Sequence, residues 1–107
     1  MATTQALNQV EPTASTVTVA YTCPSQKRAT VRVLVANRGA ADLQYRLSIA
    51  ENGAADATSQ YFVYDETLAD NGSGRSPALV LEANDEIRAY TDTATLVVTV
   101  NGIEQDT

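Results

Sequence analysis

The side chains that most often carry out catalysis are nearly absent from this sequence. Histidine does not occur among the 107 residues, and Cys23 is the one cysteine. Histidine is the usual general base, the usual partner of a nucleophilic serine or cysteine, and the commonest zinc ligand. Cys23 therefore has no base to activate it and no second thiol with which to share a metal or form an internal disulfide. We expect a buried, unreactive Cys23 and a protein assembled in a reducing cytoplasm.

Two pairs of adjacent acidic residues are the next candidates for chemistry. Asp65-Glu66 and Asp85-Glu86 have the residue types of the two carboxylates that hydrolyse glycosides. Neighbouring side chains on a strand point to opposite faces, so neither pair converges on one substrate. We interpret both pairs as solvated edge or turn residues, and we predict that the protein is not an enzyme.

A third group of side chains offers oxygen ligands. Asp65, Asp70 and Asn71 could in principle surround a calcium ion. Their spacing does not match the helix-loop-helix calcium loop, and aspartate or asparagine beside glycine is first of all a turn former. We therefore predict no metal and no cofactor, with calcium as the alternative that the sequence leaves open.

Alternation of apolar and polar residues predicts the elements that carry these groups. No window has helical periodicity, whereas two-residue alternation recurs throughout and is interrupted by turn-forming pairs such as Asn52-Gly53 and Asn84-Asp85. The expected strands cover residues 16–22, 30–35, 43–49, 61–64, 78–81, 87–90 and 96–100. About seven short strands predict an all-β fold, either an antiparallel β-sandwich or a jelly-roll-like barrel.

The alternation also divides the chain. Residues 1–14 are small and polar and are interrupted by Pro12, so we expect a flexible or partner-docked N-terminal arm there. Residues 15–104 hold all the predicted strands and form the expected β-sandwich domain. The N-terminus lacks the basic and apolar regions of a signal peptide, and no apolar run approaches the roughly 20 residues that span a bilayer. We expect neither secretion nor a membrane partner.

The charge balance restricts the class of partner. The net charge is −6, from 13 acidic and 7 basic residues, and the basic residues are scattered. A phosphate backbone would be repelled, so we predict no nucleic-acid partner. An acidic surface suits docking onto basic patches of a protein.

Tyrosine marks the surface most suited to a protein contact. The candidate interface residues are Tyr61, Tyr64 and Tyr90, together with Arg75 and Pro12. Tyrosine is enriched at interfaces because it buries a large apolar body while keeping a polar tip. The alternative is that half of the aromatic residues pack the core. We weigh the two evenly for Tyr64 and Tyr90, and favour the core slightly for Phe62.

Several strand-and-turn motifs resemble those of small virion proteins of tailed bacteriophages. They are Val-Ala-Tyr-Thr-Cys-Pro at 19–24, Lys-Arg-Ala-Thr-Val at 27–31, Tyr-Phe-Val-Tyr-Asp at 61–65 and Asp-Thr-Ala-Thr-Leu-Val-Val at 92–98. The resemblance covers most of residues 15–104. It implies a β-sandwich scaffold, and no functional residue can be carried over from it.

The resemblance implies a structural subunit of the phage particle. The leading hypothesis is a capsid decoration (cement) protein, made in the host cytoplasm, that sits on the capsid exterior and contacts the major capsid protein. Capsid symmetry favours a homo-oligomer, and specifically a trimer. The alternatives are a tail- or fibre-associated module that binds glycans, and a stand-alone carbohydrate- or peptide-binding domain.

Overall fold

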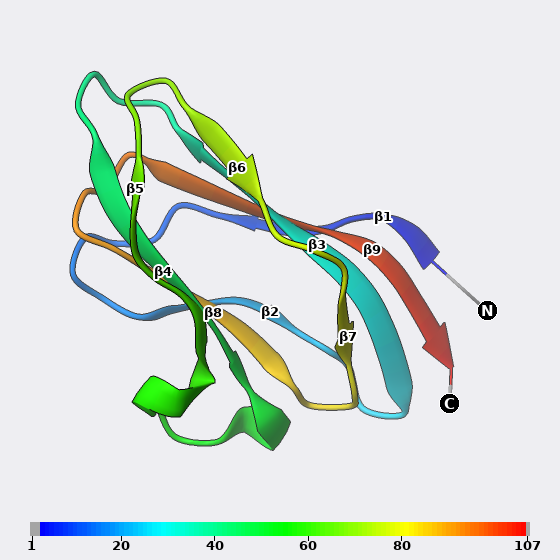
Figure 1. Ribbon diagram of the computed structural model, residues 1–107. Helices are drawn as coiled ribbons and strands as arrows, with labels where there is room; N and C mark the ends of the chain where they lie inside the picture. Colours follow the sequence, from blue (N-terminus) through cyan, green and yellow to red (C-terminus); the bar gives the residue numbers. More distant parts are fainter. Residues whose placement is uncertain (1–2, 107) are drawn as a thin grey trace.

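Two antiparallel sheets packed face to face make up the molecule (Figure 1). The computed structural model describes the backbone of residues 3–106 and the side chains of residues 7–106. Sheet A has the strand order β1-β9-β3-β6, with β7 also paired to β3, and sheet B has the order β2-β8-β4-β5. The strands are β1 Thr3–Val10, β2 Thr18–Thr22, β3 Lys27–Asn37, β4 Leu43–Ala50, β5 Tyr61–Leu68, β6 Ser73–Arg75, β7 Leu79–Leu81, β8 Glu86–Thr91 and β9 Leu96–Asp106. Of the two predicted architectures, the sandwich is confirmed.

Seven of these nine strands correspond to the predicted ones, and β1 and β6 are additional. Ser73–Arg75 overlaps the end of the glycine- and asparagine-rich segment 70–74 and pairs with β3 through Leu34↔Arg75, Val35↔Gly74 and Ala36↔Ser73. Three residues are too few to establish an alternating pattern, so β6 could not be predicted from alternation. Within the described residues the only helical segments are two short 3₁₀ turns, η1 Glu51–Gly53 and η2 Thr58–Gln60. Among those residues no helix could span a membrane.

The segment expected to be a flexible or partner-docked arm, residues 1–14, holds strand β1 over Thr3–Val10. Thr3–Val10 forms β1 at the edge of sheet A, and its register with β9 runs from Thr3↔Glu104 to Val10↔Val98. The difference has a physical cause: β9 continues to Asp106 and presents a long free edge, and backbone pairing onto an edge does not require an apolar sequence. Pro12 is buried just after β1. Met1 and Ala2, the start of the predicted arm, lie outside the described residues.

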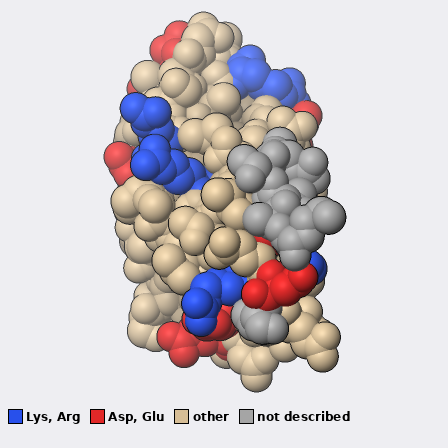
Figure 2. All heavy atoms as spheres, turned by 90° about the vertical axis from the view of Figure 1, so that its right-hand side faces the viewer, with Lys and Arg blue, Asp and Glu red and all other residues tan. Residues whose placement is uncertain are grey.

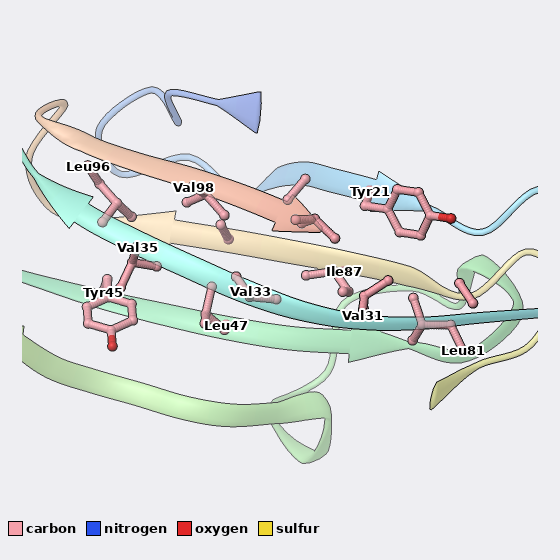
Figure 3. Close-up of a cluster of buried hydrophobic side chains, with 14 of the residues drawn as sticks. Tyr21, Val31, Val33, Val35, Tyr45, Leu47, Leu81, Ile87, Leu96 and Val98 are labelled. Carbon is pink, nitrogen blue, oxygen red and sulfur yellow. The ribbon is translucent and has the colours of Figure 1, made fainter. Parts of the chain in front are cut away.

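Inward-pointing residues of the two sheets form one core (Figure 3). Val31, Val33 and Val35 of β3 point towards sheet B, where Leu47 and Ile87 are also buried. Each fully buried aliphatic side chain contributes about 1.5–3 kcal/mol. Val33 is 0% exposed, which confirms the predicted inward face of the second predicted strand.

The β3–β9 pair is the longest ladder of the fold. Its register holds over eleven residue pairs, from Lys27↔Asp106 to Asn37↔Leu96, without a shift. Gly102 makes this possible, because it has φ +154° and an added Cβ would lie 2.0 Å from the Thr30 carbonyl oxygen. The sequence left open whether the last strand closes at Asn101-Gly102 or extends through Ile103, and the structure shows that β9 passes close to β3 at this glycine and continues to Asp106.

A buried polar residue terminates β3. Asn37 is 2% exposed, and its Nδ2 donates hydrogen bonds to carbonyl oxygens of Ala41, Leu68 and Ala69. Its Oδ1 accepts hydrogen bonds from the Gly39 amide and the Thr95 hydroxyl. One satisfied amide therefore joins the loops at this end of both sheets.

Candidate interaction surface

Three of the predicted interface tyrosines meet around one arginine on the outer face of sheet B. The guanidinium carbon of Arg46 lies 4.2 Å from the ring centroid of Tyr64, 4.6 Å from that of Tyr90 and 6.0 Å from that of Tyr61. Tyr61 and Tyr64 contact each other edge to face, with centroids 5.1 Å apart. These distances are within the range of cation–π attraction. We call Arg46, Tyr61, Tyr64, Tyr90 and Asp65 the aromatic cluster.

Strand register brings the aromatic cluster together. Tyr90 of β8 is the direct cross-strand partner of Arg46 in β4. On the other side, Tyr45 pairs with Glu66 and Leu47 with Val63, so both Tyr64 and Asp65 of β5 stand opposite Arg46. Two residues against one is a β-bulge, which redirects side chains locally. Asp65 has φ +53°, the left-handed conformation that lets it follow Tyr64 onto the same face.

The aromatic cluster has an internal ion pair. Arg46 Nε lies 2.6 Å from Asp65 Oδ1, and a second hydrogen bond of 3.2 Å joins its terminal nitrogen to Asp65 Oδ2. The hydrogen bond to Asp65 raises the pKa of the Arg46 guanidinium above its usual value. This two-point contact fixes the plane of the guanidinium between the rings of Tyr64 and Tyr90. Tyr64 remains 54% exposed, so the cluster is both ordered and accessible.

A second arginine anchors the connection from β4 to β5. Arg88 Nη1 lies 2.6 Å from Asp56 in the 54–57 loop, and Arg88 Nη2 lies 2.9 Å from Glu86 in its own strand. The Arg88 side chain is only 11% exposed. Partly buried, bidentate contacts of this kind hold a loop more firmly than an exposed pair. The loop is therefore held against the outer face of sheet B beside the aromatic cluster.

The remaining predicted interface residues lie elsewhere. Arg75 is at the edge of sheet A, in β6, on the other layer of the sandwich. Pro12 is buried within the chain and offers no exposed contact surface. The five candidate interface residues thus lie in three separate places, and of these five only the tyrosines share a surface.

The cysteine and some of the acidic residues that the sequence offered as candidates for chemistry have structural roles. Cys23 is buried, as predicted, and burial raises the pKa of its thiol. Asp85 caps two backbone turns by accepting hydrogen bonds from the amides of Asn52 and Glu82. Asp65 pairs with Arg46, and among the described side chains no group of three acidic or cysteine residues could hold a metal ion.

Phe62 lies in the edge strand β5 of sheet B. The register shift between Leu47 and Ser48 of β4 leaves Phe62 as an extra residue of β5. It is 36% exposed and lines a groove of about 390 Å³ between the edges of the two sheets, together with Tyr45, Leu79 and Arg75. Phe62 is therefore an exposed residue, and the slight preference for a core position is wrong.

Sequence reasoning missed Arg46 and Asp65. Arg46 occupies an ordinary outward position of a regular strand, and Asp65 appeared as half of an acidic pair. The one available signal was that the aromatic run 61–64 breaks strict alternation, since residues on both faces are large. A bulge is the physical consequence of that break.

Comparison with known proteins gives structural neighbours only. No family model and no curated protein matches the sequence. Two similar solved structures are crystal structures of a pentameric capsid protein isolated from metagenomic phage sequences. The first is 19% identical, with a TM-score of 0.39, over 94% of this chain and 62% of that chain. The second, solved by iodide SAD phasing, is 14% identical, with a TM-score of 0.41, over 94% and 63%. This chain spans slightly less than two thirds of the length of those proteins.

Proposed function

We propose that this protein is a non-catalytic virion structural protein, and specifically a capsid decoration (cement) subunit that stabilises the phage head. The observation that carries the proposal is the aromatic cluster on sheet B. Tyrosine and arginine dominate the energetic centres of protein interfaces, and Tyr64 and Tyr90 here are held in place around Arg46. A pre-ordered group loses little conformational entropy when a partner covers it.

The location in a virion is supported by the sequence motifs at 19–24, 27–31, 61–65 and 92–98. These motifs fall on β2, the start of β3, the first half of β5 and the start of β9. They therefore lie on the two sheets of the sandwich. A decoration subunit needs a rigid scaffold and an exposed contact face, and both are compatible with a chain that has no histidine. The major capsid protein is the proposed partner.

The experiment is cryo-electron microscopy of the phage particle together with rebinding to heads that lack this protein. We expect density for the sandwich on the head exterior, with sheet B facing the shell. Tyr64→Ala combined with Arg46→Ala should reduce occupancy of stripped heads about tenfold or more, since centres of this kind contribute at least about 2 kcal/mol. Thr67→Ala, an exposed change in the same strand, is the matched control. Heads without this density would reject the proposal.

The alternative is a tail- or fibre-associated module that binds glycans. The exposure of Tyr64 favours it, because sugars stack on tyrosine rings. Against it, Arg46 is already stacked on the rings of Tyr64 and Tyr90. Density at the tail tip with specific glycan binding would select this alternative over the head location.

A further inference from the structure

The outer face of sheet A differs from the rest of this acidic protein because its strands place no carboxylate there among the described side chains, and Glu82, which follows β7, pairs with Arg28 at its margin. Register and burial place alternate residues of β3, β6, β7 and β9 on the outside. The described outward residues are Arg28, Thr30, Arg32, Leu34, Ala36, Ser73, Arg75, Val80, Val97, Thr99, Asn101, Ile103 and Gln105. None of them is acidic, although the whole chain carries a net charge of −6. Figure 2 views the side on which β1, β9 and β3 lie, and both basic and acidic groups border a broad uncharged area there.

Two arginines on this face have no counter-charge. The other basic residues of this layer are paired: Lys27 with Asp106, Arg28 with Glu82 and Arg38 with Glu11. Arg32 and Arg75 have neither an ion pair nor a side-chain hydrogen bond among the described side chains. Arg75 pairs with Leu34, two residues along β3 from Arg32, so the two arginines are diagonal neighbours about 7–8 Å apart.

The same face has an apolar hollow beside these arginines. A groove of about 530 Å³ is lined by Leu34, Ala36 and Val97 together with Arg75 and Thr99. Farther along the sheet, Val80 and Ile103 flank Thr30 in one cross-strand row and are 63% and 37% exposed. An apolar floor next to unpaired positive charge is the composition of a docking surface for an acidic protein partner. We call this surface the arginine face.

The complementary charge lies on the other layer of this chain, where one of its residues, Glu66, lines the groove between the sheet edges that Arg75 also lines. Asp42, Glu66 and Asp70 are exposed and have no ion pair among the described residues, and the Asp70 amide donates to Asp42 Oδ1 over 3.1 Å. All three lie at the end of the β4–β5 pair where Leu43 meets Leu68. We call this surface the acidic edge. β5 is an edge strand of sheet B, so a neighbouring molecule can reach it.

We propose that the arginine face binds the acidic edge of a second copy of this chain, head to tail. Sheet A is four strand positions wide with eleven-residue strands at its centre, so its face covers on the order of 700 Å², close to the roughly 800 Å² per partner of standard interfaces. Two arginine faces packed on each other would bring like charges together, which disfavours a twofold contact. Head-to-tail contacts close into a ring when the rotation between copies permits. The inference uses only surfaces of this chain, so it is independent of the proposed place on a phage head.

The test is sedimentation velocity of the full chain with paired charge reversals. Wild-type protein should self-associate at about 0.01 M salt and dissociate at about 1 M salt, where the Debye length falls from about 30 to about 3 Å. Arg32→Glu/Arg75→Glu and Glu66→Lys/Asp70→Lys should each raise the dissociation constant at least about tenfold. An equimolar mixture of the two variants should associate again, because each reversed surface then meets its complement.

Two controls keep the test decisive. Thr58→Glu/Ser59→Glu adds negative charge at η2, at the opposite end of β5 from the acidic edge, and should associate like wild type. Arg32→Gln/Arg75→Gln removes charge without reversing it and should give a smaller loss, which guards against misfolding of the glutamate variant. A wild-type chain that stays monomeric at low salt would overturn the inference. So would a glutamate variant that associates normally, or a mixture that stays dissociated.

Discussion

The two sheets of this sandwich share the alternation of inward and outward side chains but differ in the register of their strand pairs. Sheet A contains an eleven-pair ladder between β3 and β9 with no register shift. Sheet B has shifts in both the β2–β8 and the β4–β5 pairs. Sheet A is shifted in its β1–β9 pair but not in the β3–β9 ladder, whose outward side chains form straight rows, and Arg32 and Arg75 have no counter-charge among the described residues. In sheet B the shift between β4 and β5 places Tyr64 and Asp65 beside Arg46, and the Asp65 carboxylate pairs with the Arg46 guanidinium. The β4–β5 bulge therefore supplies Arg46 with its counter-charge, whereas no described acidic side chain reaches Arg32 or Arg75.

The largest effect should come from the inner face of sheet A. Val33→Asp places an unpaired carboxylate at a position that is 0% exposed, which costs several kcal/mol and is comparable with the stability of a small domain. We expect an unfolded protein by circular dichroism. Thr30→Asp, on the outward side of the same strand, should remain folded. A folded Val33→Asp variant would contradict the assigned inner face.

The uninterrupted ladder of sheet A can be broken at one glycine. Gly102→Ala should destabilise the protein by about 3 kcal/mol, because φ is unfavourable and the new Cβ meets the Thr30 carbonyl. Gly74→Ala is the control, since its Cβ would lie 3.4 Å from Val35 Cγ2, an ordinary contact. Urea denaturation of both variants measures the difference. Equal midpoints would show that the close approach of β3 and β9 is not needed.

Substitutions at the bulge of sheet B should destabilise the protein less than Gly102→Ala does. Asp65→Gly and Asp65→Val both remove the ion pair with Arg46, but only glycine accepts φ +53° without strain. We expect the valine variant to be less stable than the glycine variant by about 1–2 kcal/mol. Thermal unfolding followed by circular dichroism checks the order. A valine variant as stable as the glycine variant would mean that β5 pairs without this bulge.

A hydrogen bond between the two sheets should make the stability of the protein fall at alkaline pH. Tyr21 of β2 donates to Glu104 of β9, and burial together with this carboxylate raises the pKa of Tyr21 above its usual value. Burial also raises the pKa of Tyr45. The unfolded tyrosine loses its proton near pH 10 while the folded one keeps it, so stability is complete below about pH 10 and falls above it. In urea titrations across this range, Tyr21→Phe should show a shallower decline. A variant as steep as wild type would assign the decline to other groups.

The smallest expected effect is a loss of stability at low pH that arises at the end of sheet A. The hydrogen bond and the charge of Lys27 lower the pKa of Asp106 to about 2. Because the folded pKa is below the unfolded value of about 3.9, the contribution is present above about pH 4 and lost as the pH falls towards 2. Asp106→Asn should remove this part of the acid sensitivity with little change at pH 7. An unchanged acid profile would show that the exposed pair adds nothing measurable.

Much of the architecture was predictable because alternation is a local property. Val31, Val33 and Val35 identify the inward face of β3 without knowledge of any partner strand. Of the candidate surface, Tyr61, Tyr64 and Tyr90 were predictable from residue type, since tyrosine is favoured at interfaces. Arg46 was not, because its surroundings depend on residues in two other strands.

The sequence by itself determined an all-β fold, either a sandwich or a jelly-roll-like barrel, with its inner faces, its main turns and the lack of histidine chemistry. Only the tertiary structure decided that residues 3–10 complete a sheet, that Tyr64 and Asp65 share a face with Arg46, and that Arg32 and Arg75 have no counter-charge among the described residues. The physical reason is that side-chain direction follows the two-residue period of a single strand, whereas neighbours across a sheet follow from register. Register is set by strands far apart in the chain, and one inserted residue changes which side chains meet.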